Sequence, residues 1–142
     1  RNFQAENFKV LHPGGKLGAQ LSTVYQLMHK GASLPIVDRT ATMGDTLLEM
    51  TSKGFGVAIV MNSGKIYGVI TDGDLRRHMN NLMAKTAGEI ANLAPITIGH
   101  NDLAVEALTL MNKNKINVII ATDNSQNPIG ILHIHDCLRA GL

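Results

Sequence analysis

Residues 68–77 read GVITDGDLRR, and the stretch returns in altered form as GILHIHDCLR at residues 130–139. In both places a glycine and branched apolar residues lead into a segment with an aspartate and, three positions later, an arginine. The apolar run predicts a strand, and the polar residues after it predict the first turn of a helix. The chain therefore contains the same strand–helix junction twice.

The repeat extends upstream from these junctions. The sequence PIV at 35–37 matches PIT at 95–97, and FGV at 55–57 lies over INV at 116–118. The offset grows from about 60 to about 62 residues, as two small insertions in loops would produce. An internal repeat of this length indicates two copies of one structural unit that share a core.

Each copy predicts a strand, a helix, two strands joined by a turn, and a second helix. The predicted elements of the first copy are 34–37, 46–53, 57–61, 66–70 and a helix from about 72. Those of the second copy are 96–98, 103–114, 118–121, 129–132 and a helix from about 135. The predicted core residues of the two longer helices recur at helical spacing: Leu47, Leu48, Met50, Leu108 and Met111.

Several residues predict where these helices begin and end. Thr42 and Asp45 have the spacing of a capping box, and Asn101 or Asp102 is expected to cap the second long helix. Gly54 stands where the first long helix should end in a left-handed residue.

Composition excludes several classes of protein. The net charge is only +2 and the basic residues are scattered, so we expect no nucleic acid partner. No apolar run reaches membrane-spanning length. The single cysteine, Cys137, excludes an internal disulfide and favours a reducing, cytoplasmic location. Because the chain begins at Arg1 without a signal-peptide pattern, we expect a piece cut from a longer protein.

The motif at 68–77, the PIV start, the leucine-rich helix and the buried hairpin together resemble the tandem cystathionine β-synthase (CBS) domain pair. The resemblance covers about residues 24–142, with repeats at 24–79 and 87–142. It implies an α/β (α+β) fold in which two βαββα repeats pack sheet to sheet with pseudo-two-fold symmetry. Such pairs bind adenosyl compounds and other nucleotides in their central clefts.

The remaining residues narrow the resemblance. RNF at 1–3, LHPGGKLG at 11–18 and HIHDCLRAG at 133–141 resemble the arabinose 5-phosphate isomerases, a family with a sugar isomerase (SIS) domain followed by a CBS pair. Residues 1–20 would then be the tail of the SIS domain and a linker. The family interconverts ribulose 5-phosphate and arabinose 5-phosphate, toward Kdo for lipopolysaccharide or capsule. Most of the SIS domain is absent, so we expect this chain alone to be inactive.

The resemblance assigns His12 to the isomerase active site of the intact enzyme. An aldose–ketose isomerase moves a proton between neighbouring carbons, and a histidine can serve as its acid or base. The alternative is a histidine held in a Pro-Gly-Gly turn, with no role in this chain.

Thr71 and Asp74 match the Thr-x-x-Asp that holds ribose and phosphate in nucleotide-binding CBS pairs. An aspartate can accept hydrogen bonds from two vicinal hydroxyls, although the same spacing is also a capping box. Arg77 could pair with a phosphate, or lie on a solvated helix face. Thr40 could line the cleft, or belong to a loop.

The second copy has His133 and Asp136 at the corresponding positions. Asp136 could hold a ribose, and a protonated His133 could meet a phosphate below about pH 6.5. Alternatively, His133 donates to the backbone at the strand end. A metal site built from His133, His135 and Asp136 lacks an evident fourth ligand, so we expect neither metal nor cofactor.

The expected partner is therefore a nucleotide or sugar-nucleotide effector, namely CMP-Kdo, AMP or ATP. Since charged residues make up only 17% of the chain, an apolar surface is expected to be covered. This favours a homodimer of CBS pairs, within a tetramer in the intact enzyme, and no membrane partner. The alternative function is a ligand-free assembly module that dimerises the isomerase.

Overall fold

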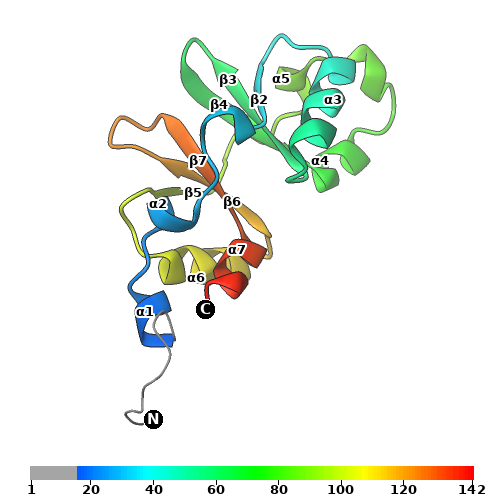
Figure 1. Ribbon diagram of the computed structural model, residues 1–142. Coiled ribbons are helices and arrows are strands. Elements are labelled where there is room, and N and C mark those ends of the chain that lie inside the picture. Colours follow the sequence, from blue (N-terminus) through cyan, green and yellow to red (C-terminus); the bar gives the residue numbers. More distant parts are fainter. Residues whose placement is uncertain (1–15) are drawn as a thin grey trace.

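The computed structural model describes residues 16–142 and contains two α/β halves, one above the other in Figure 1. The first half consists of β2 (Ile36–Asp38), α3 (Met43–Lys53), β3 (Val57–Asn62), β4 (Lys65–Thr71) and α4 (Asp72–Arg77). The second half consists of β5 (Thr97–Gly99), α6 (Ala104–Asn114), β6 (Val118–Thr122), β7 (Pro128–His133) and α7 (Ile134–Arg139). The predicted α/β fold, with βαββα twice, is confirmed.

The connecting segments contain three short helices and two 3₁₀ turns. The helices are α1 (Lys16–Gln20), α2 (Val24–Leu27) and α5 (Ala87–Ile90). The 3₁₀ turns are Gly31–Ser33 and Leu82–Ala84.

The two sheets have the same topology. Their strand orders are β2-β3-β4 and β5-β6-β7, and in each the first pair is parallel and the second antiparallel. Each central strand carries an irregularity at the equivalent place, after Val60 in β3 and after Ala121 in β6. Residues 57–60 of β3 and 119–122 of β6 are all buried, as expected for strands covered on both faces.

The short helix before each repeat packs on the sheet of the other half. Val24 and Met28 are buried in the core of the second half, while Ala87 and Ile90 are buried in the core of the first half. Figure 1 shows α2 beside the β5–β7 sheet and α5 beside the β2–β4 sheet. The two segments are therefore exchanged between the halves.

Paired backbone bonds fix this exchange at corresponding positions. His29 forms two hydrogen bonds with Ile131, of 2.8 and 2.9 Å, and Asn92 forms two with Val69, of 2.8 and 3.0 Å. Since Val69 and Ile131 are equivalent in the repeat, these contacts express the predicted pseudo-two-fold symmetry.

An apolar seam joins the faces of the two sheets. Leu34, Val57 and Ile131 form a buried cluster, against which Phe55 and Val118 pack. Residues from both halves meet in this cluster, so each sheet buries this part of its surface only against the other half.

Two predictions about the helices are wrong in detail. Leu48 is 70% exposed, because α3 turns Met43, Thr46 and Met50 toward the sheet and leaves Leu48 on the opposite side. The N-cap of α6 is Leu103, whose backbone N–H is accepted by Glu106, rather than Asn101 or Asp102. Asp102 accepts instead from the N–H of Gly99.

Other predictions about helix ends are confirmed in whole or in part. Gly54 ends α3 in the left-handed region, at φ +78°. The side chain of Thr42 accepts from the N–H of Asp45, but the structure shows no bond from Asp45 back to Thr42 that would complete a capping box.

Two glycines allow the exchanged segments to approach β4 and β7. A Cβ on Gly68 would overlap the backbone of Asn92, and a Cβ on Gly130 would overlap the side chain of Met28. The backbone of Asn92, which two hydrogen bonds join to Val69, cannot shift as a methionine side chain can. The close approach at Gly68 is therefore the more rigid of the two.

We predict that Gly68→Ala lowers the free energy of unfolding by about 2 kcal/mol, because the added carbon pushes α5 and its following segment off the sheet. Gly130→Ala should cost less, since Met28 can repack. Gly18→Ala is the matched control, because no atom lies within 4 Å of its added carbon. Urea unfolding of the three variants checks this order, and equal stability of Gly68→Ala and Gly18→Ala would contradict it.

Candidate functional site

Two cavities of about 600 Å³ each lie where the halves meet. Cleft 1 is lined from the first half by Thr71, Asp72, Arg76 and Arg77, and from the second half by Ile96 and Lys115, among others. Cleft 2 is lined by His29, Lys53, Phe55, His133, His135, Asp136 and Arg139, among others. Each cleft thus faces one of the two repeated strand–helix junctions.

A capping box builds the junction at cleft 1. Oδ2 of Asp74 accepts from the backbone N–H of Thr71 at 2.9 Å and from its hydroxyl at 3.1 Å. Oδ1 of Asp74 accepts from Nη2 of Arg77 at 2.6 Å. Asp74 is only 5% exposed and does not line the cleft, whereas its partners Thr71 and Arg77 do. The capping interpretation is therefore observed, and the ligand-binding role of Asp74 stays a prediction.

The carboxylate of Asp136 has donors on three residues, whereas that of Asp74 has donors on two. It accepts from the backbone N–H of His133 at 2.9 Å and from Arg139 at 2.6 Å. Nε2 of His29 lies 3.0 and 3.1 Å from its two oxygens. Burial raises the pKa of Asp136, but these hydrogen bonds and the nearby positive charge outweigh it and hold the pKa below its ordinary value.

His133 acts as the N-cap of α7. Its Nδ1 accepts a hydrogen bond from the backbone N–H of His135 at 3.0 Å, so the backbone is the donor and not, as one alternative predicted, the acceptor. Burial, followed by the neighbouring His135, lowers the pKa of His133. Protonating Nδ1 would break the cap, so the structure disfavours the protonated His133 considered as a phosphate ligand.

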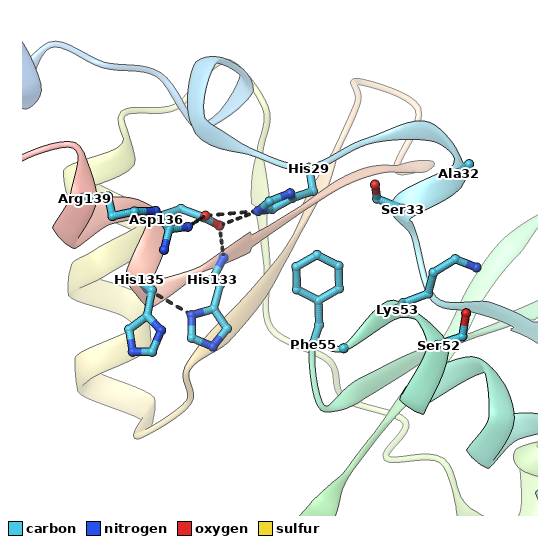
Figure 2. Close-up of a pocket in the computed structure, with 11 residues that line it drawn as sticks. His29, Ala32, Ser33, Ser52, Lys53, Phe55, His133, His135, Asp136 and Arg139 are labelled. Atoms are coloured by element: carbon cyan, nitrogen blue, oxygen red, sulfur yellow. Dashed lines mark hydrogen bonds and ion pairs between the residues drawn. The ribbon is translucent and has the colours of Figure 1, made fainter.

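Sequence reasoning missed His29 and Phe55. Figure 2 shows His29 reaching to the Asp136 carboxylate, with the Phe55 ring nearby. Their ring centroids lie 5.0 Å apart, and Phe55 lines both clefts. No signal in the sequence pointed to His29, because its segment reaches Asp136 only by packing on the second half.

One other predicted site residue lies away from both clefts. Thr40 lines neither cleft; its N–H and hydroxyl donate to Asp38 at 3.0 and 2.6 Å. His12 lies outside the described residues. Arg77 and His133 line cleft 1, and His133 also lines cleft 2 with Asp136.

Two features of residues 16–142 bear on function. No group of three or more histidine, cysteine or acidic side chains in this part is placed to hold a metal ion. None of its helices has the length and apolar character needed to cross a membrane.

Comparison with known families matches the CBS domain model to residues 21–81 and 87–142. The arabinose 5-phosphate isomerase KdsD of Pseudomonas aeruginosa is 40% identical across the whole chain, which covers 45% of that protein. The enzyme of the same name from Escherichia coli K12 is 38% identical, with 44% of its length covered. The chain thus spans less than half the length of these relatives.

Solved structures show the same fold. The CBS domain of a bacterial CNNM/CorC family Mg²⁺ transporter, in complex with ATP, aligns with a TM-score of 0.72 at 20% identity, over 87% of this chain and 89% of that one. CBSX2 in complex with AMP aligns with a TM-score of 0.72 at 21% identity, over 84% and 95%.

Proposed function

The chain belongs to the CBS domain family, and we propose that it is the regulatory CBS pair of an arabinose 5-phosphate isomerase. Identity of 38–40% to enzymes of that name, along the whole chain, supports the assignment. The longer protein would interconvert ribulose 5-phosphate and arabinose 5-phosphate in the cytoplasm, toward Kdo for lipopolysaccharide or capsule. Its CBS pair would bind a nucleotide or sugar-nucleotide in cleft 1 and pass that signal to the isomerase domain.

The arrangement of Asp74 and Arg77 carries this proposal. A carboxylate has about four acceptor positions, and Thr71 and Arg77 use three of those on Asp74. The Arg77 side chain is 65% exposed, so it can leave without a large loss of packing. Ribose hydroxyls can then take its place on Oδ1 of Asp74, and the released guanidinium can pair with the phosphate of the same ligand.

The rest of cleft 1 suits such a ligand. Its volume of about 600 Å³ is in the range of small-molecule sites. Arg76 and Lys115 also line it and supply further positive charge, while Val57 and Ile116 supply apolar surface for a base or sugar. We favour CMP-Kdo, because feedback by a pathway product would be sensible, with AMP and ATP as competitors. Solved relatives with AMP and ATP support the adenine nucleotides.

We predict that Asp74→Ala weakens the binding of whichever of CMP-Kdo, AMP and ATP the wild type binds by at least about tenfold, the loss expected when a charged acceptor of ligand hydroxyls is removed. Calorimetric titration of the chain with each nucleotide checks this. Glu89→Ala is the matched control, because it removes an equivalent capping contact, to the N–H of Thr86, outside the cleft. Equal affinity in Asp74→Ala and wild type would remove Asp74 from the site.

We predict that this chain alone shows no isomerase activity toward ribulose 5-phosphate. The intact protein should be active, and His12 would belong to its isomerase site. A coupled assay of both proteins, with and without nucleotide, checks the assignment. Turnover by the 142-residue chain would show that catalysis needs less of the protein than proposed.

A second candidate function is assembly, which a patch of exposed apolar side chains favours. Leu48 is 70% exposed and Met83 is 64% exposed. They lie close together, because the Met83 side chain packs beside Gly44, one helical turn before Leu48 on α3. A second copy of the chain would cover this patch in an isologous dimer, and two such dimers would suit a tetrameric enzyme.

We predict that the wild-type chain sediments as a dimer and that the double variant Leu48→Lys, Met83→Lys sediments as a monomer. Two buried charges per copy would have no partner in the dimer interface. Leu21→Lys is the control, since Leu21 is 68% exposed and precedes Ser22 and Thr23, which pair with the second half, whereas the patch lies on the first. A wild-type monomer, or a dimer that survives the double substitution, would contradict this interface.

A further inference from the structure

The charges around cleft 2 cancel when its three histidines are neutral. Arg139 pairs with Asp136 at 2.6 Å, and Lys53 pairs with Glu49 at 2.6 Å. The remaining titratable groups that line the cleft are His29, His133 and His135. Glu49 does not line the cleft, so an anion there meets at most the single surplus charge of Lys53, and a proton on one of the imidazoles adds to that charge.

Two of these imidazoles already take part in hydrogen bonds within the protein. Nε2 of His29 faces both oxygens of Asp136, so a proton added to His29 strengthens that pair and leaves little charge for a ligand. Nδ1 of His133 accepts the backbone N–H of His135, so a proton there would cost the cap of α7. In this neutral form His133 keeps its proton on Nε2, where it can donate to an anion.

His135 is the remaining imidazole. It is exposed, and none of the hydrogen bonds found within residues 16–142 uses either of its ring nitrogens. Its ring centroid lies 4.5 Å from that of His133, and Arg139 follows it by one helical turn on α7. Figure 2 shows the two imidazoles side by side at the wall of the cleft.

We propose that cleft 2 is a proton-coupled anion site, which binds the phosphate group of a ligand together with a proton on His135. His133 contributes a neutral donor, and His29 draws Asp136 toward itself so that Arg139 can turn to the anion. Cleft 1, which Lys115, Arg76 and Arg77 line, needs no such proton. The proposal shares with the proposed function only the use of the clefts as ligand sites.

The sign of the pH dependence follows from linkage. A bound dianion stabilises the imidazolium of His135, so its pKa is higher in the complex than in the free protein. Affinity is therefore greatest at low pH, where the imidazole already carries its proton, and declines as the pH rises. A rise of about one unit makes the ligand bind roughly fivefold tighter at about pH 6 than at about pH 8.

Sulfate is the probe for this site, because it resembles a phosphate group yet does not titrate in this range. The experiment follows the imidazole resonances of the chain by NMR through a pH titration, with and without sulfate at constant ionic strength. We expect sulfate to raise the pKa of His135 by about one unit and to bind roughly fivefold tighter at the lower pH. An unchanged His135 pKa would overturn the proposal.

His135→Gln should lose the pH dependence of sulfate binding, while His78→Gln, a control for the total charge of the protein, should keep it, since His78 lines neither cleft. Circular dichroism confirms that each variant folds. Retention of the pH dependence by folded His135→Gln would also overturn the proposal. Titration with CMP-Kdo, AMP and ATP at about pH 8 separates the two proposals: sulfate that shifts His135 while none of the three nucleotides binds would refute only the nucleotide proposal.

Discussion

The exchange of α2 and α5 between the halves is the constraint on which the rest of the structure depends. Each sheet has only three strands and is too small to bury its apolar faces alone. The helix that precedes each repeat completes the core of the other, and Leu34, Val57 and Ile131 then seal the two sheet faces. The two halves therefore share one core and do not form two independent domains.

This arrangement also creates the two clefts and connects them. Each cleft is lined by residues of both halves: Thr71 and Lys115 line cleft 1, and Asp136 and Lys53 line cleft 2. Phe55 and His133 line both clefts. A ligand in one cleft that moved either side chain would therefore change the shape of the other cleft. A ligand that favours one arrangement of the halves has a direct physical route to bias the whole pair.

The two junctions have the same backbone framework but differ in the donors that their aspartates use. Both aspartates accept from a cap N–H and from an arginine three residues later. In cleft 1 the third donor is the hydroxyl of Thr71, and in cleft 2 it is the imidazole of His29. An imidazole from a distant segment thus takes the place of a hydroxyl of the cap residue, and the carboxylate keeps its three donors.

The sequence by itself determined the repeat and the element order, and it offered the cap at Asp74 as one of two alternatives, because apolar periodicity and local caps are set by neighbours in the chain. It misplaced Leu48 and the cap of α6, where the rotation of a helix against its sheet decides exposure. Only the tertiary structure brought His29 to Asp136, across 107 residues, and Phe55 between the clefts. Such contacts depend on how the exchanged segments cross, and no local pattern of residues encodes that crossing.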